Sequence, residues 1–350
     1  MPARVDRRPE VSDPLLEVRD LAVEFASARG TVHAVNHLSF SVGAGEAVAF
    51  VGESGSGKSA TALAIAGLLP REARVVTGHI RFGDRDLLAL SDGQMRAVRG
   101  RQIGMVFQDP MTSLNPTLTV GLQITEAITA HFHMERGEAR SKAIELLEWV
   151  GISSPAQRFG QYPHEFSGGM RQRVMIAIAL SCQPQLLIAD EPTTALDVTI
   201  QGQILDLLVR LRSEMKMAII LITHDLAVAA QLAERIHVMY AGRIVEAGPA
   251  TDIFKATRHP YTLGLLNSIP RIDAPKRRLV PIVGTPPNLL ADDPGCPFVP
   301  RCPLAISRCT VEDPSVDPLP ENPAHRVACW VNGPHPEPGS PRAATSAESQ

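Results

Sequence analysis

The sequence predicts an α/β fold with a parallel β-sheet at its centre, and three apolar runs support this prediction. The first run, 47–51, leads into a glycine-rich loop and then into a helix-like stretch. The other two, 186–189 and 218–222, are short and uninterrupted, as in strands that are buried on both faces of a parallel sheet. Asp190 and His224 lie within two residues of the ends of these runs, where open α/β sheets place their chemistry.

The bulk properties of the chain favour a globular protein without a nucleic-acid partner. It has 350 residues, 44% of them apolar, and a net charge of −3. No apolar run approaches the ~20 residues that a membrane helix requires, and the N-terminal residues contain no apolar signal segment. We therefore expect a cytosolic protein, in which five cysteines indicate metal or redox chemistry before disulfides.

The first part of the chain predicts an antiparallel sheet that leads into the parallel core. Residues 1–14 are expected to form a disordered leader. Apolar residues alternate over 15–25, and strand-like character continues over 32–42. A further hairpin is expected at 78–88, because its glycines punctuate a strand-like pattern.

The middle of the chain predicts a helical subdomain, about 109–181, inserted into this core. Within it, the stretch 139–150 places apolar residues on one helix face and stops at Gly151. After Pro270, proline is frequent and regular structure is expected to be sparse. The last stretch, 333–350, has the composition of a disordered tail.

The loop at 52–59 has the pattern Gly-x-x-x-x-Gly-Lys-Ser of a phosphate-binding P-loop, between a strand and a helix start. Its glycines let successive main-chain N–H groups point at phosphate oxygens, and the helix N-terminus adds partial positive charge. We expect Lys58 to reach the β- and γ-phosphates and the Ser59 hydroxyl to hold Mg²⁺. The other loop residues expected to contact the nucleotide are Gly52, Ser54, Gly55 and Gly57.

Two carboxylates follow the apolar run at 186–189. Asp190 is placed to hold Mg²⁺ through water, and Glu191 is placed to polarise an attacking water. An acidic cap on the next turn is the structural alternative. The P-loop in the same predicted domain favours the functional interpretation.

A second anion site is predicted at the helix start Ser167-Gly168-Gly169, which combines a hydroxyl, exposed N–H groups and the helix dipole. One nucleotide needs only one P-loop. We therefore expect this site to serve a nucleotide held by another subunit, in a head-to-tail pair with ATP between the chains. A simple capped helix is the alternative interpretation.

Six motifs, in this order and spacing, resemble the nucleotide-binding subunit of an ABC transporter over about residues 15–250. They are 52–59, Gln108, 166–170, 186–191, 194–197 and His224. The resemblance implies an α/β fold, namely a P-loop NTPase core with an antiparallel β subdomain and an inserted α-helical subdomain. It also implies ATP and Mg²⁺ as ligands and ATP hydrolysis as the reaction.

The resemblance further implies a role for individual residues. Glu191 is the catalytic carboxylate, and His224 senses the γ-phosphate. Gln108 senses the γ-phosphate and Mg²⁺ and links to the membrane partner. Asp197 belongs to the loop that communicates across the dimer, and Phe25 stacks on adenine unless it is simply a core residue.

The chain departs from the commonest signature of that family, Leu-Ser-Gly-Gly-Gln, at both ends. Phe166 and Met170 stand at the terminal positions, while Ser167 and both glycines remain. The main-chain contacts to phosphate are therefore kept, and contacts from a glutamine side chain are lost.

The last sixth of the chain contains four cysteines, Cys296, Cys302, Cys309 and Cys329. Their spacing lacks the close pairs usual for zinc, whereas four thiolates can ligate a 4Fe–4S cluster. Zinc and scattered thiols remain alternatives on the spacing alone. His325 is a possible substitute ligand, although histidines near chain ends are usually solvated.

Several stretches resemble the C-terminal region of oligopeptide, dipeptide and nickel importer ATPases. They are 259–262, 284–287, 296–302 and the later cysteines; the stretch 109–116, after Gln108, is similar to the same subfamily of ATPases. The resemblance implies that 251–332 form a regulatory domain, a small irregular Cys-rich extension. It also implies that the four cysteines ligate a 4Fe–4S cluster.

The function that follows from the resemblance is ATP-driven uptake of di- and oligopeptides at the cytoplasmic face of the inner membrane. The implied partners are a second ABC ATPase subunit in a heterodimer, two permease subunits that dock at 108–122, and an extracytoplasmic peptide-binding protein. An importer ATPase for nickel or another small solute and an exporter ATPase are the alternatives.

Two other classes of protein are disfavoured. A chromosome-maintenance or DNA-repair ATPase would need a long coiled coil between Ser59 and Phe166, and this interval has no sustained heptads. A zinc module that binds nucleic acid would need a more basic C-terminal region.

Overall fold

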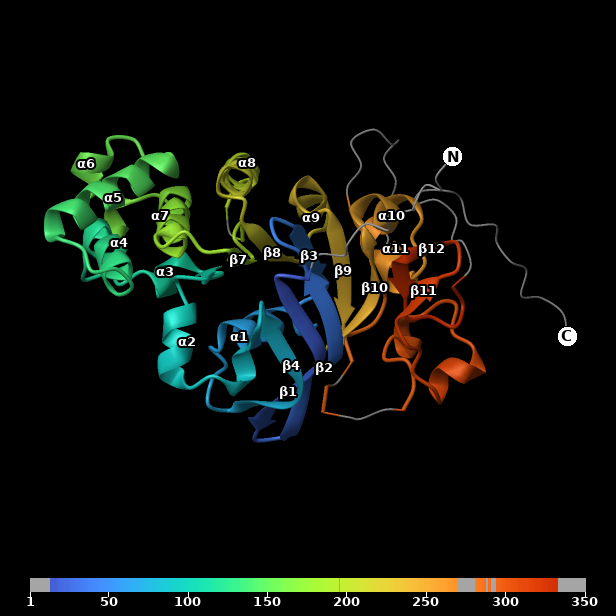
Figure 1. Ribbon diagram of the computed structural model, residues 1–350. Helices are drawn as coiled ribbons and strands as arrows, with labels where there is room; N and C mark the ends of the chain where they lie inside the picture. Colours follow the sequence, from blue (N-terminus) through green and yellow to red (C-terminus); the bar gives the residue numbers. More distant parts are fainter. Residues whose placement is uncertain (1–12, 195, 270–280, 288, 291–293, 333–350) are drawn as a thin grey trace, which may run out of the picture.

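The computed structural model describes residues 13–332, except 195, 270–280, 288 and 291–293 (Figure 1). The predicted leader lies outside the described residues apart from residues 13 and 14, and the predicted tail at 333–350 lies outside them entirely.

The N-terminal part forms a four-stranded antiparallel sheet of order β2-β1-β4-β5. Its strands are β1 (Leu16–Ser27), β2 (Gly30–Val42), β4 (Ala73–Phe82) and β5 (Arg85–Asp86). Leu16, Val18, Leu21 and Val23 on β1 are buried, so the apolar alternation read from the sequence marks the inner face of this sheet. The predicted antiparallel sheet and the hairpin between β4 and β5 are confirmed.

The central sheet has eight strands in the order β11-β12-β10-β9-β3-β8-β7-β6. Strands β6, β7, β8, β3 and β9 pair in parallel, which confirms the predicted parallel core. Every residue of β3, β7 and β8 is buried, as the unbroken apolar runs indicated. The strands are β3 (Ala47–Val51), β6 (Ile103–Val106), β7 (Leu186–Asp190), β8 (Ala218–Thr223), β9 (Arg235–Tyr240), β10 (Arg243–Pro249), β11 (Asp317–Leu319) and β12 (Asn322–Val327).

Two hydrophobic cores lie on opposite faces of the central sheet. Ala47, Ala49 and Val51 of β3 belong to one core, whereas Val48 and Phe50 belong to the other. Because successive strand residues point to opposite faces, β3 joins both cores and is held from both sides. The first core also contains buried residues of α8 (Val198–Met215) and α9 (Leu226–Leu232), and the second contains those of α1 (Lys58–Ala66) and α2 (Asp92–Val98).

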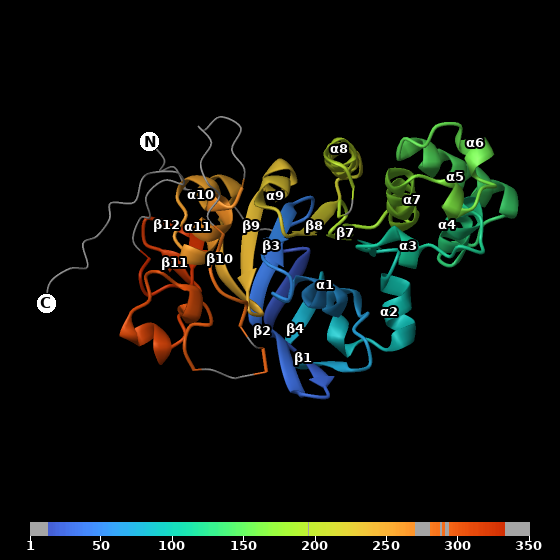
Figure 2. The same ribbon diagram turned by 180° about the vertical axis from the view of Figure 1, so that it is seen from behind.

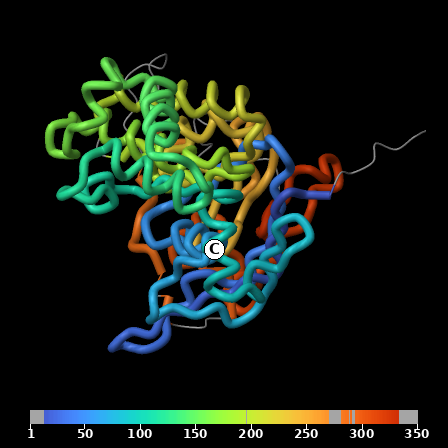
Figure 3. Tube along the Cα trace, turned by 60° about the vertical axis from the view of Figure 1, so that its left-hand side comes forward, coloured from blue at the N-terminus to red at the C-terminus, as the bar shows by residue number. Residues whose placement is uncertain are grey.

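A helical region occupies one side of the molecule in Figures 1 and 2, and Figure 3 brings it forward. It confirms that the chain between 108 and 181 is helical. The helix expected at 139–150 is α5, and Gly151 follows its end with a φ of 78°. The helices of this region are α3 (Pro110–Ser113), α4 (Val120–Thr129), α5 (Arg136–Trp149), α6 (Pro155–Arg158) and α7 (Gly168–Leu180).

The C-terminal region is more regular than the sequence indicated. After α10 (Ala250–Lys255) and α11 (Pro260–Asn267), strands β11 and β12 extend the central sheet through β10. Short 3₁₀ turns fill Leu87–Ala89, Pro163–Glu165, Val299–Arg301 and Ser307–Thr310. Strands β9 and β10 were also not predicted from the sequence. None of the helices among the described residues is long and apolar enough to cross a membrane.

A buried carboxylate ties the C-terminal strands to the sheet. Glu246 on β10 is fully buried and accepts hydrogen bonds from the main-chain N–H groups of Arg258 and His259, at 2.7 and 3.1 Å. The Nε2 atom of His325 on β12 lies 2.8 Å from Glu246 Oε1, and His325 is only 1% exposed. The expectation that His325 is solvated is therefore wrong, because this histidine is a buried partner of Glu246.

The substitution His325→Ala is expected to lower the free energy of unfolding by about 3 kcal/mol, because it deprives a buried carboxylate of one partner. Thermal unfolding of the full chain measures the effect. The matched control is His37→Ala, since His37 pairs with Asp20 at the surface and such pairs contribute under about 1 kcal/mol. Equal melting temperatures for the two variants would contradict the importance of the buried pair.

Candidate nucleotide-binding site

The predicted P-loop connects β3 to α1, and its shape depends on close main-chain contacts. A Cβ atom at Gly52 would lie 2.2 Å from the carbonyl oxygen of Met239, so only glycine fits there. Gly57 caps α1 with a φ of 98°, in the left-handed region that favours glycine. Gly55 and Ser54 lie at the tip of the loop between them. The loop is thus held in a tight curl before the helix begins.

The ammonium group of Lys58 is folded into this curl. Its Nζ donates to the carbonyl oxygens of Gly52 and Glu53, at 2.8 and 2.9 Å, and to Ser56 Oγ at 3.2 Å. Burial lowers the pKa of Lys58, while the carboxylates of Glu191, Asp190 and Glu53 act in the opposite direction. The lysine is therefore a buried cation among oxygen atoms, at the position where the sequence predicts phosphates.

Ser59 and Asp190 come together although 131 residues separate them in the sequence. The Ser59 hydroxyl donates to Asp190 Oδ1 at 3.1 Å. Burial raises the pKa of Asp190, and the hydrogen bond from Ser59 partly offsets this effect. A hydroxyl and a carboxylate side by side are oxygen ligands of the kind that Mg²⁺ prefers.

Glu191 forms the centre of a cluster at the carboxyl ends of the parallel strands. Its Oε2 atom accepts hydrogen bonds from Gln108 Nε2 at 3.1 Å and from Thr194 Oγ1 at 2.7 Å. His224 Nδ1 lies 3.5 Å from the same oxygen. Gln108 follows β6, Glu191 follows β7 and His224 follows β8, so the fold brings together three residues that the sequence predicted separately. Thr194 was given no role from the sequence.

The main chain at Glu191 is strained, with a φ of 45°. Its N–H donates to the carbonyl oxygen of Ile222 on the neighbouring strand at 2.9 Å, which fixes this conformation. The side chain therefore leaves the sheet edge in a defined direction, and Gln108 and Thr194 then hold the carboxylate.

The predicted second anion site is the N-terminus of α7. Ser167 is its N-cap and accepts a long hydrogen bond, 3.4 Å, from the N–H of Met170. Gly168 and Gly169 form the first helical positions, and a Cβ atom at Gly169 would lie 2.6 Å from Ile200 Cγ2. Within the described residues, no hydrogen bond or ion pair joins 167–169 to the P-loop of the same chain.

Asp197 is the N-cap of α8 and accepts a hydrogen bond from the N–H of Ile200 at 2.9 Å. Since Ile200 on α8 packs on Gly169, the starts of α7 and α8 are in contact. Ala195, in the middle of that loop, lies outside the described residues. Phe25 lies on β1, half-buried, and packs against the core beneath the antiparallel sheet.

The four C-terminal thiols lie close enough to influence one another. Burial raises the pKa of Cys296, and the neighbouring Cys309 and Cys302 raise it further. Burial together with Cys302, Cys296 and Cys309 raises the pKa of Cys329 to about 11. Within the described residues, however, no group of three or more His, Cys, Asp or Glu side chains is arranged to hold a metal ion.

Two C-terminal side chains that sequence reasoning left without a role reach the P-loop. Tyr261 and Arg301 both contact Glu53, the residue after the first glycine of the loop. Their position in the sequence is the signal that could have identified them, since both lie in stretches that resemble importer ATPases.

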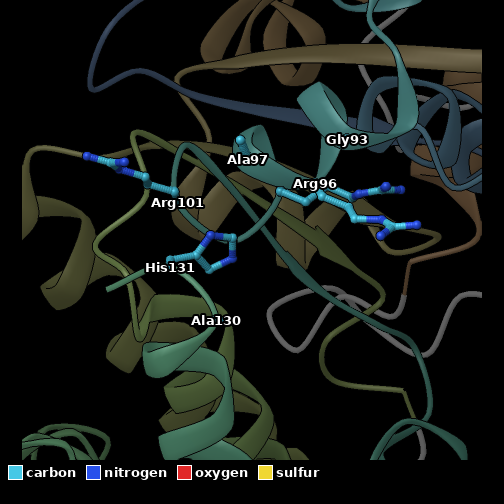
Figure 4. Close-up of a pocket in the computed structure, with 8 residues that line it drawn as sticks. Gly93, Arg96, Ala97, Arg101, Ala130 and His131 are labelled. Carbon is cyan, nitrogen blue, oxygen red and sulfur yellow. The ribbon is translucent and has the colours of Figure 1, made fainter. Parts of the chain in front are cut away.

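Two surface cavities are relevant to the site, and the smaller of them lies at the P-loop. A cavity of about 100 Å³ lies against the P-loop residues 53–56 and is also lined by Tyr240 and Pro287. A larger one, about 610 Å³, lies near the start of the helical region and includes Arg96, Arg101 and His131 (Figure 4). None of the predicted nucleotide-binding residues lines the larger cavity.

Comparison with protein families identifies two matches along the chain. Residues 35–194 match the ABC transporter family, and residues 245–309 match the C-terminal region of oligopeptide/dipeptide transporters. The second match covers the stretch that contains Tyr261, Arg301 and three of the four clustered cysteines.

Individual proteins are similar over most of this chain. The dipeptide transport ATP-binding protein DppD of Bacillus subtilis is 51% identical, over 91% of this chain and 95% of the relative. The oligopeptide transport ATP-binding protein OppD of Escherichia coli is 50% identical, over 94% and 96%. A solved dimeric ATP-binding cassette bound to ADP and Pi is 28% identical with a TM-score of 0.61, over 67% of this chain and 98% of that one.

The substitution Gly169→Ala is expected to destabilise the protein by about 1–3 kcal/mol, because the new Cβ would overlap Ile200 Cγ2. Ile200 is β-branched and cannot swing away easily. Thermal unfolding measures the loss, and adding Ile200→Ala should relieve the overlap.

The control for this prediction is Gly202→Ala, whose new Cβ would meet no atom within 4 Å. It should leave the stability unchanged or raise it, since alanine favours helix. A stable Gly169→Ala variant would show that the starts of α7 and α8 do not depend on this contact.

Proposed function

The chain belongs to the ABC transporter family, among the ATP-binding subunits of peptide transporters, and from this premise we propose its function in detail. It hydrolyses ATP to drive the uptake of di- and oligopeptides through separate permease subunits. The observation that best supports hydrolysis is the Glu191 carboxylate, held by Gln108 and Thr194 beside the Ser59–Asp190 pair. Peptides are favoured over nickel and over export because residues 245–309 match the C-terminal region of oligopeptide/dipeptide transporters.

The catalytic roles follow from the charges and donors around the P-loop. Main-chain N–H groups of 52–59 and the Lys58 ammonium bind the phosphates, with the Gly52, Ser54, Gly55 and Gly57 positions shaping the loop. Ser59, Asp190 and Gln108 would hold Mg²⁺, which supplies charge neutralisation for the transferred phosphoryl group when bound.

Glu191 is the residue that we assign to the attacking water. A carboxylate whose direction is fixed by hydrogen bonds orients a water molecule better than a mobile carboxylate does. The entropy cost of ordering the carboxylate is then met before the water binds. His224 Nδ1 lies 3.5 Å from the same oxygen of Glu191, and we assign to this histidine a hydrogen bond to the γ-phosphate. Phe25 is assigned to stacking on adenine.

The complete site requires a second subunit. Ser167, Gly168 and Gly169 form a helix start of the kind that binds anions, and it makes no hydrogen bond or ion pair with the P-loop of its own chain among the described residues. They would close on ATP bound to the partner, with Asp197 at the loop between the two sites. We propose a heterodimer with a related ATPase, in which ATP joins the subunits and hydrolysis releases them.

The permease contact is assigned to the stretch 108–122. It contains Met111 and Leu122, which are 61% and 41% exposed, and Phe107 next to it is 39% exposed. Exposed large apolar side chains close together in the sequence suit a protein partner rather than water. Two permease subunits and an extracytoplasmic peptide-binding protein complete the transporter, with this chain at the cytoplasmic face of the inner membrane.

We propose that the four C-terminal cysteines ligate a 4Fe–4S cluster. Burial raises the pKa of Cys296, Cys302 and Cys329, and hydrogen bonding from the main-chain N–H groups of Phe298, Leu304 and Val331, respectively, acts in the opposite direction with a smaller effect. Hydrogen bonds of this kind are typical around cluster ligands, and ligands of a cluster lie farther apart than ligands of one ion. The donor set therefore fits this group, which would cross-link the region and supply an electron site.

The domain boundaries belong to the same proposal. Residues 15–250 form the nucleotide-binding domain, with its helical subdomain at about 109–181. Residues 251–332 form the C-terminal domain of the peptide-importer type. Nucleic acid has no place in this function.

The substitution Glu191→Gln should preserve ATP binding and lower the hydrolysis rate by about 10²–10⁴-fold, because the water loses its general base. Nucleotide binding and phosphate release are measured on the same preparation, and a closed dimer should accumulate with ATP. Lys58→Ala serves as the binding control, since it removes the phosphate-binding cation and should lose ATP affinity. Full turnover by Glu191→Gln would remove Glu191 from the catalytic role.

Anaerobically purified protein should be brown and contain about four iron atoms per chain, because a 4Fe–4S cluster has that stoichiometry. Iron analysis and the absorption spectrum measure this directly. Cys302→Ser should lose the colour, whereas Cys182→Ser should keep it, because Cys182 lies in the helical region at the end of α7. Colourless protein loaded with zinc would contradict the cluster.

A further inference from the structure

Glu53 is held at all three of its polar groups. Its main-chain N–H donates to the hydroxyl oxygen of Tyr261 at 2.8 Å, and its carbonyl oxygen accepts from Lys58 Nζ at 2.9 Å. Its carboxylate receives two bonds from Arg301, Nη1 to Oε2 at 2.6 Å and Nη2 to Oε1 at 2.9 Å. Two of these three contacts come from the C-terminal region, more than 200 residues away in the sequence.

The side chain of Arg301 is buried at this position rather than exposed at the surface. Its side chain is 3% exposed, and its guanidinium also donates to the carbonyl oxygens of Val283 and Ile282, at 3.2 and 3.4 Å. The hydroxyl of Tyr240 lies 3.3 Å from Nη1. A two-pronged arginine–carboxylate pair with a buried guanidinium, a partly buried carboxylate and its remaining donors occupied has a single favourable geometry.

An aromatic cluster supports both C-terminal contacts. The rings of Tyr240, Tyr261 and Phe298 pack against each other with centroids 4.6 to 5.4 Å apart. Phe298 precedes Arg301 in the same short turn, and Tyr261 lies at the start of α11. The positions of Tyr261 and Arg301 are therefore fixed relative to each other and to β9, which carries Tyr240.

We propose that Arg301 and Tyr261 are positioning residues for the phosphate-binding loop, so that the C-terminal region forms part of the nucleotide site. By holding Glu53 they hold the loop at the point where its carbonyl oxygen contacts Lys58. The inference rests on the proposed binding of ATP by this loop. It goes beyond that function by assigning phosphate affinity to residues outside the nucleotide-binding domain.

The physical reason is that phosphate binding by main-chain N–H groups depends on their direction. A loop without side-chain anchors must be ordered when the nucleotide arrives, and this cost weakens binding. A loop already fixed at Glu53 avoids that cost. Coupling of this kind is reciprocal, so bound nucleotide should also stabilise the region around Arg301.

The test measures the affinity of the full chain for MgATP by calorimetry. Arg301→Gln and Glu53→Gln should each weaken binding by at least tenfold, and Tyr261→Phe should weaken it by a smaller factor. Arg301→Lys should recover only part of the affinity, because lysine keeps the charge and loses the two-pronged geometry. The double variant Glu53→Gln/Arg301→Gln should bind no more weakly than either single variant, since both act through one contact.

The matched control is Arg308→Gln, which breaks an arginine–glutamate pair in the same region without touching the P-loop. It should bind MgATP as the unaltered chain does. Hydrogen exchange gives the second measurement: MgATP should slow exchange at 296–302 in the unaltered chain and in Arg308→Gln, and not in Glu53→Gln. A purely structural role would lower the melting temperature without changing this response.

The outcomes separate this inference from the proposed function. If MgATP binds the unaltered chain and is lost in Lys58→Ala, yet Arg301→Gln and Glu53→Gln bind it within twofold of normal, the positioning role is refuted alone. If the unaltered chain does not bind MgATP, the proposed function fails as well. If Arg301→Gln does not fold, Glu53→Gln tests the same contact from the side of the loop. Tyr261→Phe tests the second contact between the C-terminal region and Glu53.

Discussion

The parallel pairing of four strands is the constraint on which the site depends. β6 pairs with β7, β7 with β8, and β8 with β3, so all four strands end at one edge of the sheet. In this register Asp190 lies beside Ile222, and Val51 lies beside Thr223. The residues that follow each strand therefore meet, whatever their separation in the sequence.

Burial at this edge makes the charges depend on one another. Burial disfavours the charged forms of both Lys58 and Asp190, and each charge opposes that effect on the other. A buried arrangement of opposite charges without direct contact contributes little net stability, since the cost of desolvation offsets the attraction. Its presence is better explained by a ligand that carries strong charge of its own, as a nucleotide with Mg²⁺ does.

The C-terminal region is attached to the rest of the chain at two kinds of contact. β12 continues the central sheet beyond β10, with Glu246 and His325 buried between the two strands. Arg301 and Tyr261 reach the P-loop from the same region. Because one attachment fixes the sheet edge and the other fixes the phosphate loop, a change in this region has a direct physical path to the nucleotide.

The sequence by itself determined the elements whose signal is local. Unbroken apolar runs identified β3, β7 and β8, and the glycine pattern at 52–59 identified the loop, because burial and tight turns restrict the choice of residues within a few positions. The family resemblance carried by the order of motifs predicted that Gln108, Glu191 and His224 belong to one site. The hairpin at 78–88 and the helical region after residue 108 followed from pattern in the same way.

Only the tertiary structure decided the contacts made by single side chains far apart in the sequence. No periodicity or spacing in the sequence predicts the contacts of Thr194 with Glu191, of His325 with Glu246 and of Arg301 with Glu53. Strand β11 has only three residues and β12 has no unbroken apolar run; β12 pairs with the edge that β10 offers, and β11 then pairs with β12. Such contacts depend on where the whole chain has packed, so they exist only once the fold has brought their partners together.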